Sequence, residues 1–395
     1  MKNFIFISPN FPEQYWHFCD ELKKNGLNVL GIGDCPYENL TNELRGSLNE
    51  YYKVSSLENY DEVYRAVAFF TFKYGRIDWL ESNNEYWLER DAKLRTDFNI
   101  QSGFHTEDME HVKYKSKMKE CYKKARIATA RYWLVDNYDN CKAFIDQVGY
   151  PVIVKPDNGV GAAMTYKLKS DEDLKNFLNS KDDTLYIMEE FIEAEVNSYD
   201  AIVNSKGEPI FENGNVTPFS LMDVVNDADN CCFYERATLP EKLIKKGRAA
   251  LKAFNVRSRM VHFEFFRLTK DQHIGKKDDI VALEVNMRPS GGISPTMMNW
   301  ANGTDVYKIW ADMIAFDKTE KGKTNNQICV FAGRRNGKNF VMSADEIHAK
   351  YGANLKMEGP VEEALSNTMA NYMYIATFDT EEETMQFVKE VFENH

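Results

Sequence analysis

The sequence has little of the composition that marks disordered, collagen-like or membrane-spanning chains. Its 395 residues include only 21 Gly and 11 Pro, whereas 43% are hydrophobic and 13% aromatic, which is enough to build a packed interior. No apolar run approaches the ~18 residues that a membrane span needs, and the short apolar stretch near the N-terminus ends at Pro9. We therefore expect a globular protein with no export signal and no membrane anchor.

The cysteines do not form the patterns of a metal site or a disulfide framework. There are seven of them, with no CxxC pair and no His at zinc-ligand spacing. The count is odd, and the neighbouring Cys231 and Cys232 would make an awkward disulfide. Reduced thiols are typical of the cytoplasm, which is the location we expect.

An excess of basic residues is also missing. Lys and Arg number 49 against 61 Asp and Glu, which gives a net charge of −12. Because nucleic-acid binding depends on cations that neutralise phosphates, we expect no nucleic-acid partner. Residues 113–125 nevertheless hold six lysines. A solvated helix face is the ordinary explanation for most of these lysines.

The order of predicted elements indicates an α/β protein of two or three domains. A strand at 3–8, a helix after Pro12 that ends near Gly26, and a second strand at 28–34 suggest a parallel unit. The first turn of this unit lacks the glycines of a dinucleotide-binding loop. We expect domains at 1–112, 113–316 and 317–395, with the polar stretch 317–326 at the last boundary.

The segment ALEVNMRPSGG is the sharpest candidate for chemistry. Strand alternation places Glu284, Asn286 and Arg288 on one face. If the preceding strand pairs with this one about their connecting loop, Glu264 falls opposite Glu284. Facing carboxylates repel each other unless a cation lies between them, and this oxygen-rich set suits Mg²⁺, with an arginine beside it for a phosphoryl group. A solvent-facing strand with ordinary salt bridges is the favoured alternative for this motif by itself.

Two further segments are ambiguous when each is taken singly. Lys155 ends an apolar strand and precedes the loop DNGVGAAM, whose small residues would let backbone N–H groups approach phosphates. It is not a P-loop, and an ordinary glycine-containing hairpin is equally compatible with it. The strand TLYIMEEFI at 184–192 runs directly into acids. Such acids are usually just exposed.

Together and in this order, the three motifs resemble the ATP-grasp superfamily. The likeness is to its carboxylate–amine ligases, such as the L-amino acid ligases and D-alanine–D-alanine ligase, and to the related biotin carboxylase. It covers nearly the whole chain. The resemblance implies an α/β (α+β) fold in which a Rossmann-like pre-ATP-grasp domain precedes the ATP-grasp domain. A lid subdomain at about 120–188 and a small C-terminal α/β domain complete the expected architecture.

The resemblance also implies a role for each matching residue. Lys115 and Lys155 would bind the ATP phosphates, and Lys155 and Arg288 would be the catalytic residues. The remaining expected contacts are Gly159, Gly161, Ala162 and Met164 in a lid loop; Glu189 for the adenine amine; Glu190, Phe191 and Ile192 as hinge backbone; Glu195 for the ribose; Glu264, Glu284 and Asn286 for Mg²⁺ or Mn²⁺; and Ser290, Gly291 and Gly292 for the substrate. The family often has Gly followed by acids after the hinge, whereas this chain has Ala194, Glu195 and Val196, so either Glu195 takes the ribose position or Val196 replaces the family's glutamate there.

The expected function is ATP- and Mg²⁺-dependent ligation of a carboxylate to an amine through an acyl phosphate, with release of ADP and phosphate. The partners would be a small-molecule carboxylate and amine, with a homodimer as a possible assembly. Arg236 could pair with a substrate carboxylate, although a surface or interdomain salt bridge is the commoner role. A bicarbonate-using carboxylase and a non-catalytic ATP-binding regulatory protein are the alternatives.

Overall fold

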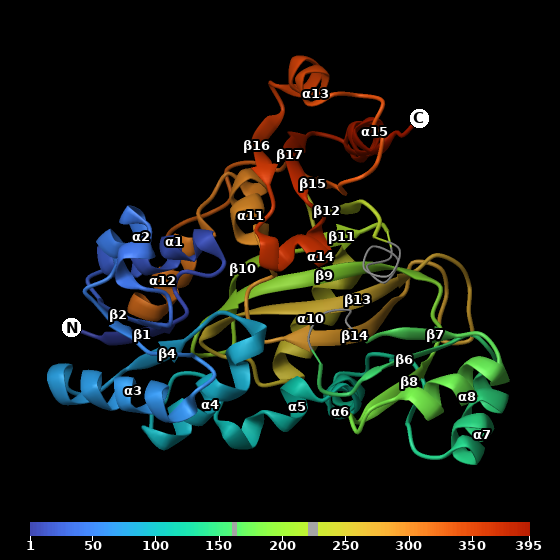
Figure 1. Ribbon diagram of the computed structural model, residues 1–395, viewed down its shortest axis with the longest axis horizontal. Coiled ribbons are helices and arrows are strands. Elements are labelled where there is room, and N and C mark those ends of the chain that lie inside the picture. Colours follow the sequence, from blue (N-terminus) through green and yellow to red (C-terminus); the bar gives the residue numbers. More distant parts are fainter. Residues whose placement is uncertain (160–163, 220–227) are drawn as a thin grey trace.

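The computed structural model describes residues 1–159, 164–219 and 228–395. Figure 1 shows three regions: an N-terminal α/β region in blue, a small sheet with two helices in green, and a long sheet that reaches the C-terminal elements in red. Gly161 and Ala162 of the expected lid loop lie outside the described residues.

The N-terminal region is the predicted parallel α/β unit. Its strands are ordered β3-β2-β1-β4, with every pair parallel, and β1 and β2 are buried along their whole length, as expected for a sheet covered on both faces. The helix predicted after Pro12 is α1. It begins at Trp16, because the residues that directly follow Pro12 first form a 3₁₀ turn. The elements are β1 (Asn3–Ile7), η1 (Glu13–Tyr15), α1 (Trp16–Lys24), β2 (Asn28–Gly33), η2 (Tyr37–Asn39), α2 (Asn42–Ser47), β3 (Glu50–Lys53), α3 (Tyr60–Tyr74), β4 (Trp79–Glu81), η3 (Glu85–Trp87), α4 (Leu88–Asp97), η4 (Thr106–Asp108) and α5 (Glu110–Lys113).

The small sheet has the strand order β5-β8-β6-β7, and all of its pairs are antiparallel. Ser170 caps the helix α8, because its side chain accepts a hydrogen bond from the backbone N–H of Asp173. The elements from this part of the chain are α6 (Lys115–Lys124), β5 (Tyr132–Leu134), α7 (Tyr138–Val148), β6 (Val152–Pro156), β7 (Tyr166–Leu168), α8 (Asp171–Ser180) and β8 (Tyr186–Glu190).

The long sheet joins the middle of the chain to its C-terminus. Its order is β14-β13-β9-β11-β12-β15-β17-β16, and β10 also pairs with β9. The strands after residue 317 therefore extend the same sheet through the pairing of β12 with β15. Its elements are β9 (Ala194–Val203), β10 (Pro209–Asn213), β11 (Asn215–Thr217), β12 (Cys231–Glu235), α10 (Glu241–Ala253), β13 (Arg259–Leu268), β14 (Ile280–Asn286), α11 (Ser294–Asn302), α12 (Val306–Phe316), β15 (Ile328–Arg334), α13 (Ala344–Tyr351), β16 (Leu355–Pro360), η5 (Glu363–Leu365), α14 (Ser366–Met369), β17 (Tyr372–Phe378) and α15 (Glu381–Phe392).

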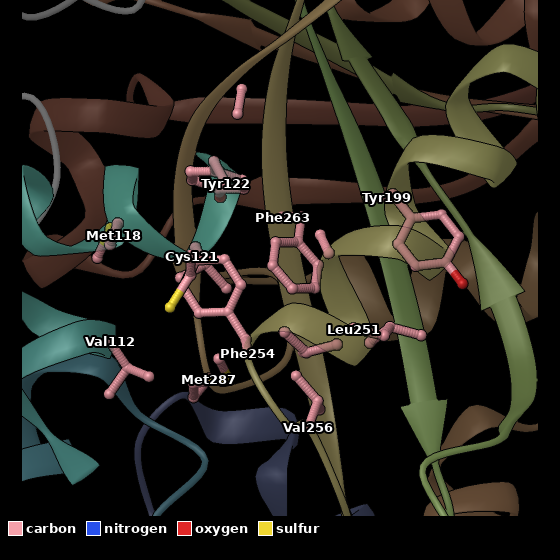
Figure 2. Packing of buried hydrophobic residues seen from close by; sticks show 14 of the residues in the cluster. Val112, Met118, Cys121, Tyr122, Tyr199, Leu251, Phe254, Val256, Phe263 and Met287 are labelled. Atoms are coloured by element: carbon pink, nitrogen blue, oxygen red, sulfur yellow. The ribbon is translucent and has the colours of Figure 1, made fainter. Parts of the chain in front are cut away.

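One face of β9 and β13 is closed by an apolar core. Figure 2 shows Tyr122 of α6, Phe254 and Phe263 packed together beneath these strands. Gly247 lets α10 lie directly on β9, because a Cβ there would fall 2.2 Å from the ring of Tyr199. The opposite face of the same strands is thereby left for polar side chains.

Among the described residues, no helix combines the length and the apolar character that crossing a membrane requires.

Candidate active site

The register of β13 and β14 brings the two predicted carboxylates together. Glu264 is paired with Glu284, and His262 with Asn286, in an antiparallel ladder that shifts register after Glu264. This confirms the pairing inferred from the loop between the strands. Their apolar neighbours Phe263 and Val285 face the core, so the polar side chains share the other face of the sheet.

Lysines connect these carboxylates to the small sheet. The Nζ of Lys115 lies 3.5 Å from Oε2 of Glu284 and donates to the carbonyl oxygen of Gly159 at 3.1 Å. The Nζ of Lys155 lies 2.8 Å from Glu189. Burial would lower the pKa of Lys155, but the carboxylates of Glu189 and Glu284 outweigh it and hold this pKa above its usual value. Lys155 therefore stays charged.

Glu189 bridges two lysines inside the small sheet. Its other carboxylate oxygen lies 2.6 Å from the Nζ of Lys119, a residue that the sequence did not single out. Burial would raise the pKa of Glu189, yet Lys119 and Lys155 lower it to about 2. Both carboxylate oxygens thus contact lysines, and the predicted contact of Glu189 with the adenine amine stays a prediction.

Asp157 holds Lys115 in place at the start of α6. Its carboxylate accepts hydrogen bonds from the backbone N–H of Ser116 at 2.7 Å and from the Ser116 hydroxyl at 2.6 Å, while its carbonyl accepts from the N–H of Lys115. A carboxylate at a helix N-terminus satisfies free N–H groups and complements the helix dipole. This long-range cap was not predicted.

Glu85 contributes to the site from the N-terminal region. The guanidinium of Arg288 donates to its carboxylate, and the amide nitrogen of Asn286, in the orientation that satisfies both groups, donates at 2.8 Å. Burial would lower the pKa of Arg288, but Glu85 raises it above its usual value. Sequence reasoning missed Glu85, although it closely follows the carboxyl end of β4, where ligand-binding residues of parallel sheets gather.

The predicted hinge begins at Glu190, the last residue of β8. Glu190 accepts from the backbone and the guanidinium of Arg131, and Ile192 is buried. Phe191 is partly exposed, with the Nζ of Lys167 4.0 Å from its ring centroid. The side chain of Glu190 is therefore bound to Arg131, that of Ile192 is buried, and that of Phe191 is exposed. The contact between the hinge backbone and adenine stays a prediction.

The structure does not bring Glu195 and Arg236 to the other site residues. Glu195 pairs with Arg267, and Arg236 donates to the side-chain oxygen of Asn197 at 2.6 Å. Glu195 and Asn197 alternate with Val196, so they lie on the core face of β9, opposite Glu264 and Glu284. The sequence could not show this face because it depends on the register of β9 with β13.

The segment after Arg288 packs against the N-terminal region. Ser290 is buried, with its hydroxyl 3.4 Å from the side-chain nitrogen of Asn215. Gly292 has a φ of +58°, which favours glycine, and its carbonyl accepts from Gln14 at 2.6 Å. Ser290, Gly291 and Gly292 thus continue directly from the predicted catalytic strand.

Met164, from the far end of the expected lid loop, is close to the hydroxyl of Tyr186.

Solved structures of several enzymes share the architecture over the full length of the chain. An L-amino acid ligase from Bacillus licheniformis matches with a TM-score of 0.72 at 15% identity, covering 99% of this chain and 97% of that one. A phosphoribosylglycinamide synthetase from Anaerococcus prevotii matches with a TM-score of 0.66 at 18% identity, covering 100% and 98%. The chain has the ATP-grasp fold.

A third ATP-grasp structure of similar likeness contains nucleotide and metal. It is the biotin carboxylase domain of the Hydrogenobacter thermophilus 2-oxoglutarate carboxylase in complex with MgADP, ADP and bicarbonate, with a TM-score of 0.69 at 15% identity, covering 100% of this chain and 90% of that one. No protein-family model matches the sequence. At these identities the likeness establishes the ATP-grasp fold and leaves the reaction to be argued from the site.

The oxygen atoms on the polar face of the ATP-grasp sheet fit a magnesium ion. Among the described residues, no cluster of three His, Cys, Asp or Glu side chains forms a metal cage. Glu264 and Glu284 are nevertheless paired on one face, with Asn286 beside them. Mg²⁺ usually takes one or two carboxylates together with substrate phosphates rather than a complete set of protein ligands. The donor set therefore suits a metal that arrives with a nucleotide.

Proposed function

We propose that the protein is an ATP- and Mg²⁺-dependent ligase that joins a carboxylate substrate to an amine through an acyl phosphate. The supporting observation is that Glu264 and Glu284 are paired on β13 and β14, with Lys115 of α6 beside Glu284 and Arg288 two residues beyond the end of β14. This arrangement combines oxygen ligands for a metal, a cation for phosphates and an arginine held by Glu85. Phosphoryl transfer depends on this kind of electrostatic positioning.

In the first step, a carboxylate oxygen of the substrate attacks the γ-phosphorus of ATP, and the bond to the ADP oxygen breaks. Lys115 and Lys155 would place the phosphates, and Arg288 would stabilise the negative charge on the transferring group. Mg²⁺, when bound by Glu264, Glu284 and Asn286, would supply neutralisation of phosphate charge. The product of this step is an acyl phosphate.

In the second step, an uncharged amine attacks the acyl carbon and phosphate leaves as the amide bond forms. The amine gives up its proton in this step. Because water competes with the amine for an acyl phosphate, the arrangement must keep water away. Arg288 would stay on the phosphate as it becomes the leaving group.

The lysine contacts are compatible with the binding of nucleotide phosphates. Lys155 and Lys115 make ion pairs with the carboxylates of Glu189 and Glu284. Lysine carries a compact charge on a flexible stem, so both could turn to phosphates. Their carboxylates would then be free to accept the metal or to stabilise the nucleotide.

The test measures ADP and phosphate release from ATP with Mg²⁺ and pools of amino acids, with and without bicarbonate. We expect release that requires a carboxylate and an amine together, and identification of the amide by mass spectrometry. Arg288→Ala should lower kcat by about 10²- to 10³-fold, the cost of removing a group that stabilises transition-state charge. Arg257→Ala, at an exposed arginine, is the matched control. Release that depends on bicarbonate alone would instead favour a carboxylase and contradict the ligase proposal.

A further inference from the structure

Three lysines of the lysine-rich segment 113–125 are buried and do not belong to a solvated helix face. They are Lys113, Lys115 and Lys119, each at most 7% exposed. Lys115 and Lys119 each pair with a carboxylate of the site. Lys113 differs from both, because its Nζ makes no ion pair or hydrogen bond with any residue that the structure describes. A buried charge without a partner is unfavourable, and nothing in the proposed phosphoryl transfer uses Lys113.

Lys113 lies at the edge of the proposed site. It is the last residue of α5, and Lys115 begins α6 two residues later. Both helices pack against β14 (Figure 1), the strand that carries Glu284 and Asn286 and ends two residues before Arg288. Lys113 is therefore placed between the N-terminal region and the strand of the predicted metal ligands.

The charges that act on Lys113 include those that the phosphoryl transfer would use. Burial lowers the pKa of Lys113, and the cations of Lys115 and Arg288 lower it further, while Glu85 and Glu89 act to raise it. Three cations are thus close enough to repel one another in a largely buried place. An anion bound among them would offset both the burial and this repulsion.

The two nearby carboxylates are engaged elsewhere. Glu85 accepts a hydrogen bond from the guanidinium of Arg288. Glu89 is exposed and accepts from the side-chain nitrogen of Asn158 at 3.5 Å. Neither carboxylate forms an ion pair with Lys113, in contrast to the carboxylates beside the other two buried lysines. The contacts of Lys113 are therefore left for a ligand to complete.

The γ-phosphoryl group of ATP is the anion that suits this position. In the proposed first step it lies between Lys115 and Arg288, and both of these residues are within electrostatic range of Lys113. A terminal phosphate carries about −1.5 to −2 charges at neutral pH, and lysine binds phosphate as a compact point charge. ADP lacks this group and would leave Lys113 without a partner.

We propose that Lys113 binds the γ-phosphoryl group of ATP, and that the site uses this contact to distinguish ATP from ADP. The ammonium group would donate a hydrogen bond to an oxygen of the γ-phosphoryl group and would keep this contact when the group is transferred to the substrate. Lys113 stays protonated and gives up no proton in the step. This inference rests on the ATP binding of the proposed function and adds a residue to the same site.

The first test measures the dissociation constants of ATP, its β,γ-imido analogue and ADP by calorimetry, with Mg²⁺ and without carboxylate or amine. Lys113→Met should weaken the binding of both triphosphates by about 10- to 100-fold, the effect of one charge-assisted hydrogen bond, and should leave ADP nearly unchanged. Lys123→Met, at an exposed lysine of α6, should change neither. Equal losses for ATP and ADP, or no loss for either, would overturn the inference.

The second test separates ligand binding from a structural role. Without nucleotide, Lys113→Met should keep or raise the midpoint of thermal unfolding, because methionine removes an unpaired charge from a buried place. Nucleotide raises the midpoint of a protein that binds it. At equal concentrations, the rise with ATP should be smaller in Lys113→Met than in the unmodified protein, and the rise with ADP should be the same. A fall in the midpoint of equal size without nucleotide, with ATP and with ADP would make Lys113 a structural cation and overturn the inference.

Nucleotide binding also separates this inference from the ligase proposal. If Lys113→Met loses affinity for ATP selectively but no amide forms from any carboxylate and amine, the inference survives and the ligase proposal fails. If ATP-dependent amide formation occurs, and Lys113→Met leaves the ratio of the ADP and ATP dissociation constants unchanged, the ligase proposal survives and the inference fails.

Discussion

Two clusters of buried charge lie on either side of the same strands, and they are built differently. At the active site, lysines pair with the carboxylates of Glu189 and Glu284, and Glu264 keeps 21% of its side chain exposed. At the junction between the N-terminal region and β13, Glu81 pairs with Arg95 and Arg259. These three side chains are at most 6% exposed.

The two clusters differ in the groups that accept hydrogen bonds from their arginines and lysines. Arg259 donates to the carbonyl of Met287 at 2.7 Å, and Arg95 donates to the carbonyls of Leu80 and Phe104 at 2.8 Å. Backbone carbonyls fix the planar arginines in one geometry. At the active site, Lys115 and Lys119 each donate to one backbone carbonyl, of Gly159 and Ala130. Their remaining contacts, and that of Lys155, are with carboxylates that a metal or phosphate could displace. Burial of charge therefore indicates ligand binding only where the partners can be exchanged.

The largest effect should come from breaking the junction cluster. Among the described residues, Arg259→Met leaves the buried Glu81 with one cation contact, to Arg95 at 3.5 Å, and it frees the Met287 carbonyl. Removing one partner of a buried ion pair typically costs about 3–5 kcal/mol. We expect a clear fall in the midpoints of thermal and urea unfolding. The exposed Arg257→Met serves as the control, and an unchanged midpoint for Arg259→Met would show that the junction charges are not structural.

The active-site cluster should respond in the opposite way. Glu264→Gln should reduce ADP formation by about 100-fold and raise the Mg²⁺ concentration needed for half-maximal rate, because a metal ligand contributes several kcal/mol to charge stabilisation. The unfolding midpoint should change little, since Glu264 is partly exposed and contacts His262 at 3.1 Å. The measurement is a Mg²⁺ titration of initial rates alongside thermal unfolding. A stability loss as large as that of Arg259→Met would erase the distinction between the clusters.

Local patterns in the sequence predicted the parts of this site that lie along one strand or one helix. Alternation and loop symmetry placed Glu264 opposite Glu284, as the register of β13 and β14 confirms. The contacts of Glu85 and Asp157 could not be predicted in the same way, because each joins segments far apart in the chain. Glu195 was a plausible ribose ligand by position. Only its pairing across β13 shows that its side chain faces the core.

The architecture was predictable for a similar reason. Strand-helix-strand order with short connections predicted the N-terminal parallel sheet. The joining of β15 to β12 required knowledge of pairing between distant strands. The junction cluster was also missed, since Arg259 and Glu81 belong to separate regions of the chain.

The smallest effect concerns Asp91, which lies beside the junction cluster. Burial and the neighbouring carboxylate of Glu81 raise the pKa of Asp91 to about 7, although Arg95 and Ser82 act to lower it. This folded-state pKa is above the unfolded value of ~3.9. The folded state therefore holds the proton more tightly, and its stabilising contribution is complete below pH ~4 and lost as the pH rises through 7.

Replacing Asp91 by Asn should remove this pH dependence while keeping the local contacts. The backbone N–H and the hydroxyl of Ser82 donate to one carboxylate oxygen of Asp91 at 2.9 and 2.6 Å, and an amide oxygen can accept both. Between pH 6 and 8, the unmodified protein should lose about 1 kcal/mol that Asp91→Asn does not lose. Thermal unfolding at both pH values measures this, with Asp61→Asn at an exposed position as the control. An identical pH response of Asp91→Asn and the unmodified protein would mean that Asp91 is already ionised at pH 6, and that the junction tolerates a second buried carboxylate charge beside Glu81.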